Sequence, residues 1–473
     1  MIKLEAGRMI MKIKLNKKQQ EALKLIKSGV NVFLTGDAGT GKTTVIRKAV
    51  EDLEAAGKNV LITATTGIAA DNIGMGAMTV HKALRITVKF EKYKEGKGRR
   101  SHYLQAADVL IIDEISMCRF DLFTQIVKNI ETENNKRKES GYLYKGKKKG
   151  PVQLIVVGDF FQMPPVITQE DRAALVELYG NDYDEGEIYE KGYAFFSEAW
   201  RKMEFHFIKL EKVCRQKDAE FLNILNEIKY GRNIDKVINY LQNNQHAESI
   251  KGATCLVGTN AEADRINQKH LDALDSETER TFHAIVEGDV NEVDIKNISF
   301  AKEHLILNIG AKVMLTANDT HNEYVNGTMG TVVGFRVGKG EDACIQVLTD
   351  RGKQIDVYRY VREIERQEIE KYIEKNNSGE SITVLRIVRT TVGYFKQFPI
   401  RVAWAMSIHK SQGQSFDSLN IDPCCWVSGQ FYVAVSRGRS IENIHFLRTI
   451  KKNYIQSLSN KELEILEESM GQY

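Results

Sequence analysis

What the sequence lacks narrows the class of protein at once. Its 6 cysteines form no Cys-x-x-Cys pair and have no accompanying histidine spacing, which argues against zinc sites and a disulfide framework. No apolar run approaches the roughly 20 residues that span a bilayer. Residues 1–15, MIKLEAGRMIMKIKL, lack the apolar core and cleavage site of a signal peptide. We therefore expect a cytoplasmic protein with no membrane partner.

An excess of one charge is missing as well. The 67 lysine and arginine residues nearly balance the 63 aspartate and glutamate residues, which leaves a net charge of +4. The total charge therefore predicts no class of partner, although a basic groove can exist on a nearly neutral surface. Residues 80–105 and 134–151 carry many charges, and each stretch is either a solvated loop or a contact with phosphates.

Near-continuous apolar runs alternate with helical stretches in the first part of the chain. The runs are NVFLTG at 31–36, NVLITAT at 59–65, DVLIIDE at 108–114 and VQLIVVGD at 152–159. Such runs are typical of parallel strands buried on both faces. They predict an α/β lobe over residues 1–190, with a small insertion at about residues 80–105. The full length of 473 residues leaves room for roughly three domains.

A second α/β lobe is predicted from residue 191, in two parts. Its strand candidates are TCLVGTN at 254–260, IRVAWAMSIHK at 400–410 and IENIHFLRT at 441–449. Short strands separated by turn residues at 311–400 predict a small antiparallel barrel inserted between 191–310 and 401–473, the last part ending in a tail. Within the insertion, ERQEIEKYIEKNNSGES at 365–381 is either a charged helix or an arm of a hairpin.

The stretch GDAGTGKTT at 36–44 fits the phosphate-loop pattern, with an apolar strand before it and a helix after it. In that pattern backbone N–H groups surround phosphates, the lysine reaches the outer ones and a hydroxyl holds Mg²⁺. A glycine-rich turn is the alternative. The motif predicts a nucleotide site made by Gly36, Gly39, Gly41, Lys42, Thr43 and Thr44.

Acidic and amide side chains follow two later strands. In VLIIDEISM, Asp113 would hold Mg²⁺ and Glu114 would polarise the attacking water, unless the two acids form a simple edge turn. In IVVGDFFQMPPV, Gln162 follows the next strand and is placed to contact the γ-phosphate. The neighbouring Phe160 and Phe161 are either core residues or base-stacking platforms.

Four further residues have competing interpretations. Asn16 and Gln19 have the spacing of a capping box, but the Gln19 amide could also read an adenine edge. Arg215 in EKVCRQ and Arg437 in FYVAVSRGRS lie in the predicted second lobe. Each is either a surface ion-pair partner or a guanidinium that neutralises charge on the transferred phosphoryl group, which would require the lobes to enclose the nucleotide.

Taken in order, these stretches resemble the Pif-one family of superfamily-one, class B, 5′→3′ DNA helicases, relatives of the RecD motor. The resemblance covers about residues 15–440. It rests on LNKKQ, GDAGTGKTT, TATTGIAADNIGMGAMTVHKAL, VLIIDEISM, VVGDFFQMPPV, LEKVCRQKDAEFLNILNEIKYG, NGTMGTVVGF, VAWAMSIHKSQGQSFD and GQFYVAVSRGRS. Of these, GDFFQMPPV and AWAMSIHKSQGQSFD are far more specific than the phosphate loop itself.

The resemblance implies two RecA-like lobes of the phosphate-loop fold and a barrel resembling the Src-homology-three fold. It implies an ATP-dependent, Mg²⁺-dependent helicase that moves 5′→3′ on single-stranded DNA and unwinds forked or structured duplexes. Such a protein would be a monomer in solution, nucleoid-associated and bacterial or phage-like, and would act in DNA repair, recombination or telomere maintenance. The alternative is a DNA-stimulated translocase that displaces proteins without separating strands.

The resemblance also assigns site residues at the matching positions. The ATPase set is Gln19, Lys42, Thr43, Asp113, Glu114, Gln162, Arg215 and Arg437. The DNA-binding set is Thr65, Gly67, His81, Phe161, Pro164, Asn260, His409, Lys410 and Ser411. Read in isolation, Asn260 is equally a helix cap, and His81 and His409 are core histidines.

Some features depart from the family or leave rivals open. Cys214 stands where the family usually has an aromatic residue, and the loop at 131–150 looks longer than usual, which puts a DNA contact by KGKKKG in doubt. A GTP-dependent switch would need an NKxD-type motif, and the sequence has none. A non-catalytic nucleic-acid-binding module would bind DNA without DNA-stimulated turnover.

Overall fold

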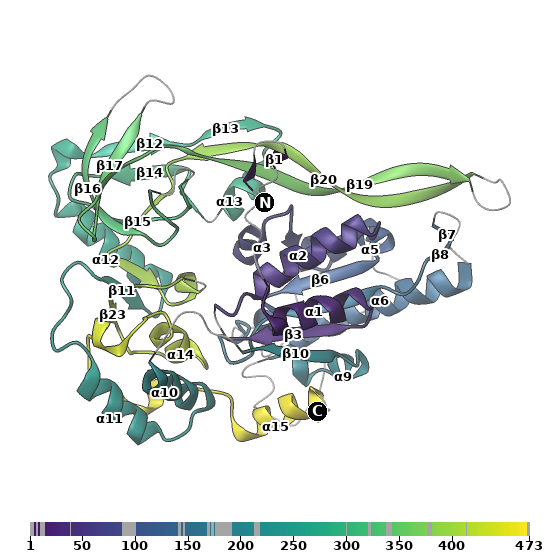
Figure 1. Ribbon diagram of the computed structural model, residues 1–473, viewed down its shortest axis with the longest axis horizontal. Helices are drawn as coiled ribbons and strands as arrows, with labels where there is room; N and C mark the ends of the chain where they lie inside the picture. Colours follow the sequence, from purple (N-terminus) through teal and green to yellow (C-terminus); the bar gives the residue numbers. More distant parts are fainter. Residues whose placement is uncertain are drawn as a thin grey trace.

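A computed structural model gives the fold. It describes residues 4–5, 8–9, 15–37, 39–87, 101–140, 143–144, 147–167, 171, 175, 192–211, 218–298, 300–319, 323–336, 343–375, 381–412 and 414–470. Figure 1 shows two α/β lobes side by side, with a β-rich insertion beside the second lobe and a long hairpin that extends over the first. No helix in the described ranges is both long and apolar enough to cross a membrane.

The first lobe is built on a six-stranded parallel sheet of order β10-β3-β9-β6-β4-β5. Its strands are β3 Val32–Gly36, β4 Val60–Ala64, β5 Met78–Thr79, β6 Val109–Asp113, β9 Gln153–Val157 and β10 His206–Leu210. Its helices are α1 Lys17–Lys27, α2 Lys42–Ala55, α3 Gly67–Ile73, α4 Val80–Leu84, α5 His102–Ala106, α6 Phe120–Ser140 and α9 Glu198–Lys202.

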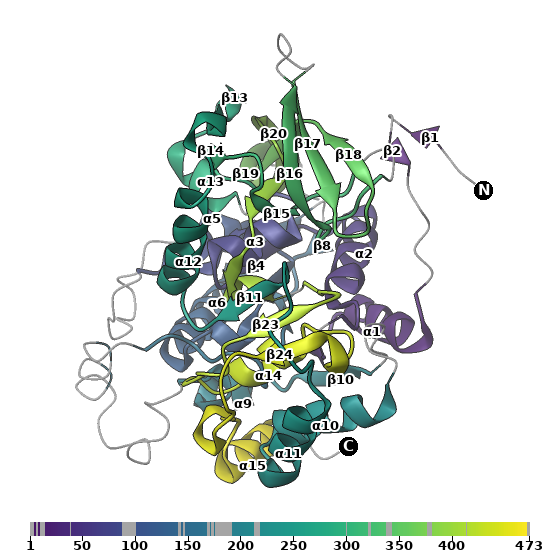
Figure 2. The ribbon, with the colours of Figure 1, turned by 90° about the vertical axis from the view of Figure 1, so that its left-hand side faces the viewer.

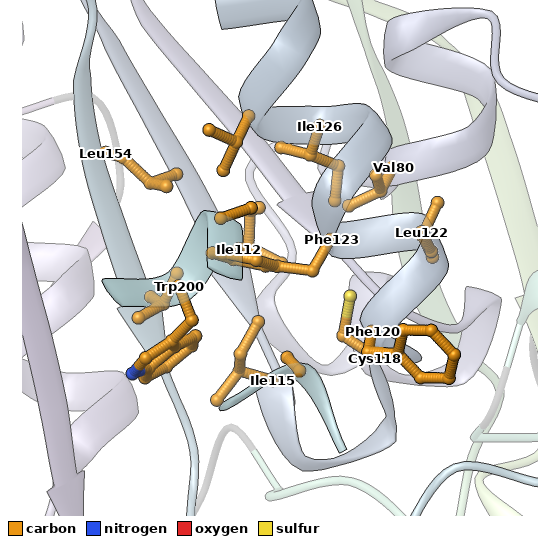
Figure 3. Packing of buried hydrophobic residues seen from close by; sticks show 14 of the residues in the cluster. Val80, Ile112, Ile115, Cys118, Phe120, Leu122, Phe123, Ile126, Leu154 and Trp200 are labelled. Carbon is orange, nitrogen blue, oxygen red and sulfur yellow. The ribbon is translucent and has the colours of Figure 1, made fainter. Parts of the chain in front are cut away.

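Alternate residues of each buried strand enter different hydrophobic clusters. In β6, Leu110 and Ile112 join the cluster around Trp200, which Figure 3 shows, whereas Val109 and Ile111 join the cluster on the other face. The sheet is therefore buried on both faces, as the continuous apolar runs predict.

The second lobe has a four-stranded parallel sheet of order β22-β11-β23-β24. Its strands are β11 Thr254–Val257, β22 Ala405–Ser407, β23 Leu419–Ile421 and β24 Ile444–Phe446. Its helices are α10 Ala219–Tyr230, α11 Ile234–Asn244, α12 Asn260–Asp272 and α14 Gln430–Val435. The predicted class, α/β with two lobes of parallel sheet, is confirmed.

The insertion contains a five-stranded antiparallel sheet of order β18-β17-β16-β15-β21. These strands are β15 Lys312–Leu315, β16 Met329–Arg336, β17 Cys344–Thr349, β18 Gln354–Val357 and β21 Ile400–Val402. Beside it lie β12 Arg280–His283, β13 Ile285–Gly288, α13 Glu292–Asn297 and β14 His304–Leu307. Closure of the five strands into a barrel stays a prediction.

A hairpin formed by β19 Tyr360–Lys375 and β20 Ser381–Gln397 leaves this sheet and lies along the first lobe (Figures 1 and 2). The described residues of the charged stretch at 365–381, namely 365–375 and 381, are thus part of a hairpin and not of a helix. The glutamates and lysines of this stretch favour a helix locally, but residue-by-residue pairing with the β-branched and aromatic strand β20 prevails. Short pairs β1 Leu4–Glu5 with β2 Arg8–Met9, and β7 Leu143–Tyr144 with β8 Lys147–Lys148, complete the described strands.

Two predicted boundaries are wrong. Strand β10 pairs with β3, so the first lobe extends past residue 190 to about residue 210. The C-terminal helix α15, Asn460–Ser469, buries Leu463 and Leu466 in the first-lobe cluster, so residues 401–473 do not all belong to the second lobe. The sequence of β10 and of α15 does not reveal either boundary, because the pattern of an amphipathic strand or helix does not indicate which sheet it packs against. Of the predicted insertion at 80–105, residues 88–100 lie outside the described residues, and the rest includes α4 and most of α5.

Candidate functional site

The phosphate loop connects β3 to α2. Gly36 ends β3 opposite Leu210, Gly39 has φ +81°, and Gly41 precedes α2 with φ +88°. The left-handed backbone at Gly41 requires glycine, and an added Cβ, 2.4 Å from Gln19 Nε2, would also displace the Gln19 amide. The first turn of α2 presents backbone N–H groups with no partner inside the helix, which is the arrangement that binds phosphate.

Lys42 and Thr43 open α2 with different surroundings. Lys42 Nζ donates to the carbonyl oxygens of Gly36, at 2.6 Å, and Asp37, at 3.3 Å, so its ammonium lies against the loop. Thr43 is exposed and Thr44 is half-buried. The ammonium can exchange carbonyl oxygens for phosphate oxygens, and the Thr43 hydroxyl is free to ligate a cation.

The capping box at the start of α1 is confirmed. Asn16 Oδ1 accepts from Gln19 N at 2.9 Å, and Asn16 N donates to Gln19 Oε1 at 3.0 Å. The same glutamine also donates through Nε2 to the Thr40 carbonyl at 3.0 Å. The cap therefore holds the Gln19 amide against the phosphate loop, and adenine recognition by that amide stays a prediction.

Asp113 ends β6, which lies inside the sheet between β4 and β9, and Glu114 follows it. The edge-turn alternative is therefore wrong. Glu114 has φ +53°, and its N–H donates to Asp113 Oδ1 at 2.8 Å. Burial raises the pKa of both carboxyl groups, and the Asp113 charge helps to raise that of Glu114 to about 7, against the attraction of Lys42. A carboxyl group with this pKa is suited to accept a proton at neutral pH.

Of the residues that follow β9, Phe160 lies in the hydrophobic core and Phe161 lies at the interface between the lobes. Phe160 lies in an aromatic cluster with Phe33, Tyr193, Phe195 and Trp200, so the core reading is right for this residue. Phe161 is half-buried, and the centroid of its ring lies 4.8 Å from the centroid of the Tyr230 ring in the second lobe. Pro164, a predicted DNA contact, is buried.

Gln162 lies between a first-lobe acid and a second-lobe amide. Its Nε2 donates to Asp159 Oδ2 at 3.3 Å, and its Oε1 accepts from Gln412 Nε2 at 3.4 Å. A Cβ added to Gly429, at the start of α14, would lie 2.5 Å from the Gln162 carbonyl, so a glycine there permits the two lobes to meet. Gln162 therefore belongs to the interface between the lobes.

Arg437 is fully buried, so the surface ion-pair alternative is wrong for it. Its Nε donates to the Val433 carbonyl at 2.9 Å and its Nη2 to Ser436 Oγ at 2.8 Å. The charge of Arg437 attracts the Glu114 carboxylate and so opposes the rise in the pKa of that group. Arg215 and Cys214 lie outside the described residues. The preceding strand, β10, belongs to the first lobe and not to the second as predicted.

The predicted DNA-contacting residues of the second lobe follow β11 and β22. Asn260 is exposed and its Oδ1 accepts from Ser407 Oγ at 2.6 Å. Ser407 Oγ in turn accepts from the backbone N–H of Lys410 at 3.3 Å. The helix-cap alternative for Asn260 is wrong, because Thr259 caps α12.

The remaining predicted DNA contacts are spread over both lobes. His409, Lys410 and Ser411 form a short 3-10 helix in which Lys410 is exposed and Ser411 is buried. In the first lobe, Thr65 Oγ1 donates to the Glu114 carbonyl at 3.0 Å, Gly67 begins α3, and His81 lies in α4. His81 and His409 are half-buried, which does not fit core histidines, and burial lowers the pKa of both.

Sequence reasoning missed three interface residues that lie inside the quoted motifs. Lys229 of α10 forms an ion pair with Asp37 of the phosphate loop, and Tyr432 of α14 donates to Asp37 Oδ1 at 3.5 Å. A signal was present, since Lys229 follows Phe221 by eight residues and Leu225 by four, on the apolar face of α10. A lysine on such a face needs a buried partner.

Comparison with known proteins agrees with this geometry. Residues 14–243 match the family model described as PIF1-like helicase. The ATP-dependent DNA helicase Pif1 of Bdellovibrio bacteriovorus is 31% identical over 446 residues, which cover 92% of this chain and 88% of that protein.

Two solved structures of Bacteroides Pif1 are also similar. The complex with ADP-AlF4 is 29% identical with a TM-score of 0.74, covering 97% of this chain and 98% of that one. The complex bound to ssDNA is 30% identical with a TM-score of 0.57, covering 97% of both chains. With its phosphate loop, carboxylate pair and buried arginine at the meeting of two lobes, the chain belongs to the PIF1-like helicase family and is an ATP-hydrolysing DNA helicase.

Proposed function

We propose that this chain moves 5′→3′ along single-stranded DNA and unwinds forked or structured duplexes as it hydrolyses ATP. The observation that carries the proposal is the meeting of polar side chains from both lobes beside the phosphate loop. Asp37 and Gln162 come from the first lobe, and Lys229, Tyr432 and Gln412, which contact them, come from the second. A nucleotide bound between the lobes would link hydrolysis to their relative movement.

In the proposed hydrolysis step, Glu114 accepts a proton from the water that attacks the γ-phosphate. Lys42, Arg437 and Arg215 neutralise charge that develops on the transferred group, and arginine in this role contributes on the order of 10³ to 10⁵ in rate. Gln162 contacts the γ-phosphate and responds to its loss. Because Gln162 is hydrogen-bonded to Gln412, that response would reach the second lobe directly.

A magnesium ion fits the same site. The Thr43 hydroxyl and the Asp113 carboxylate are the oxygen ligands that Mg²⁺ prefers, and we propose that they hold it, directly or through water. When bound, the ion neutralises phosphate charge during phosphoryl transfer.

We propose that the strand is held by the motif residues at the ends of the parallel strands in both lobes. The first lobe would contribute Thr65, Gly67, His81 and Phe161, and the second Asn260, His409 and Lys410. The buried Pro164 and Ser411 would shape these loops rather than present their side chains to the strand. The Bacteroides Pif1 structure bound to ssDNA supports this class of ligand. Stacking of bases contributes roughly 1 to 3 kcal/mol per base and tolerates any sequence. Phosphate contacts should make binding weaken steeply with added salt.

Unwinding one base-pair step costs about 1.4 kcal/mol of stacking on average, a load that one lobe movement per ATP can carry. The test is a pair of partial duplexes with one single-stranded tail each, which differ only in whether that tail is 5′ or 3′. We expect ATP-dependent unwinding of the 5′-tailed duplex alone. Unwinding of the 3′-tailed duplex alone would overturn the proposed polarity.

The second candidate is a translocase that displaces bound proteins without separating strands, since the same motifs serve both activities. It predicts displacement of streptavidin from a biotinylated single strand with no unwinding of either duplex. The helicase proposal predicts both displacement and unwinding.

A further inference from the structure

Lys229 crosses from the second lobe into the phosphate loop of the first. Although lysine is among the residues least often buried, this side chain is only 3% exposed. Its Nζ forms an ion pair with Asp37 and lies 4.4 Å from the centroid of the Phe161 ring. One ammonium group therefore contacts both the loop that holds phosphate and a residue of the proposed DNA-binding set.

The charges around Lys229 explain why it can be buried. Burial lowers its pKa, but Asp159, Tyr432 and Asp37 together hold the pKa above its usual range. Burial raises the pKa of Asp37, but attraction to Lys229, the hydrogen bond from Lys229, and attraction to Lys209 and Lys42 together lower it below its usual range. Both partners are therefore charged at neutral pH, in a pair that joins the two lobes.

The phosphate loop is contacted by a lysine from each lobe. Lys42 Nζ donates to the backbone carbonyl of Asp37, while Lys229 binds the carboxylate of the same residue. A triphosphate bound in the loop adds several negative charges beside this pair. Those charges repel Asp37 and attract Lys229, so the position of Lys229 against Phe161 depends on whether the loop is filled.

We propose that Lys229 is a positioning residue that couples nucleotide in the phosphate loop to DNA at Phe161. The inference rests on the proposed function only in taking Phe161 as a DNA contact. Because coupling is reciprocal, nucleotide must change the affinity for DNA by the same factor by which DNA changes the affinity for nucleotide. Lys229 carries that coupling through its two contacts, with Asp37 on one side and the aromatic ring on the other.

The test measures the dissociation constant of a fluorescein-labelled oligo-dT by anisotropy, with and without saturating Mg²⁺ and a non-hydrolysable ATP analogue. In the unaltered chain we expect the nucleotide to change this constant by about 5- to 150-fold. Lys229→Met keeps the side-chain length without the charge. In this variant we expect the nucleotide to change the dissociation constant for DNA by less than about twofold, which within measurement error means no coupling. Lys229→Arg should keep it. Lys236→Met, at an exposed lysine of α11, is the matched control and should behave as the unaltered chain.

Loss of one charge leaves Asp37 unpaired and can destabilise the chain, so a second variant is needed. Asp37→Asn combined with Lys229→Met removes both charges and should recover the melting temperature, because replacing a whole buried pair is close to neutral. We expect this double variant to remain uncoupled. Full coupling in either Lys229→Met variant would overturn the inference. If DNA does not stimulate ATP turnover in the unaltered chain, the proposed function fails instead.

Discussion

The second lobe and its insertion touch the first lobe at two places that differ in chemistry. At the phosphate loop the contact is buried and charged, because Lys229 is paired with Asp37. Arg437 is fully buried within the second lobe. At the far edge of the first sheet, the hairpin docks through the uncharged Gln367. Its amide accepts from Ile62 N at 3.1 Å and donates to Ile62 O at 2.8 Å.

The second contact satisfies backbone groups that the sheet leaves open. Strand β5 pairs only with Thr63 and Ala64 of β4, so Gln367 takes the place of a further strand residue beside Ile62. Ion pairs of Arg362 with Asp71 and of Arg389 with Glu54 flank it, but these are partly exposed and contribute little. The comparison indicates that charge at the first contact performs chemistry, whereas hydrogen bonding at the second fixes geometry.

The largest effect should come from Arg437→Lys. Lysine cannot reproduce the planar set of donors, so we expect DNA-stimulated kcat to fall by about 10³- to 10⁵-fold. ATP turnover at saturating single-stranded DNA is the measurement. The melting temperature is measured in parallel, since Arg437 also binds carbonyls within its own lobe. A fall below tenfold in a folded variant would mean that the first contact holds no chemistry.

The second-largest loss of turnover should come from Glu114→Gln. The amide cannot accept the proton of the attacking water, so we expect kcat to fall by roughly 10²- to 10⁴-fold while ATP still binds. A fluorescent ATP analogue measures binding, and phosphate release measures turnover. If binding falls as far as turnover, Glu114 holds the nucleotide rather than the water.

The pH dependence of turnover tests whether Glu114 accepts the proton of the attacking water. Glu114 must be ionised to accept a proton, and its pKa is raised to about 7. We therefore expect kcat/KM for ATP to fall about tenfold for each pH unit below 7, rather than only below the usual range of a carboxyl group near 4.3. The residual activity of Glu114→Gln should lack this decline. The same decline in that variant would assign it to another group.

The smallest effect on rate should come from the hairpin contact. Gln367→Ala leaves the Ile62 N–H and carbonyl buried without partners, which costs about 1 to 3 kcal/mol in the free energy of unfolding or docking. Basal ATP turnover should stay within about twofold, because the substituted group is far from the phosphate loop; chemical denaturation gives the stability. Gln354→Ala, at an exposed glutamine of β18, is the matched control. A large loss of turnover would erase the distinction between the two contacts.

The sequence predicts what is local at these contacts. GDAGTGKTT, the acids after β6 and the amide after β9 are each fixed by a strand and the turn that follows it, so their positions at one edge of the sheet could be inferred. The capping box of Asn16 and Gln19 was equally readable, because both partners lie three residues apart.

Contacts between distant segments could not be predicted in this way. Lys229 meets Asp37 across 192 residues, and a lysine in a helix usually faces solvent. Gln367 meets Ile62 across 305 residues, from a stretch whose glutamates and lysines favour a helix. In both cases a partner that is distant in the sequence determines where the side chain lies, and the local sequence pattern does not reveal that partner.

The central claim is that the second lobe completes the nucleotide site of the first. The most direct measurement compares the affinity for ADP with aluminium fluoride, which mimics the transferred phosphoryl group, with the affinity for ADP alone. The account predicts that the unaltered chain binds the mimic far more tightly than ADP, and that Arg437→Lys loses this preference while its ADP affinity is unchanged. An equal preference in the two proteins would contradict it.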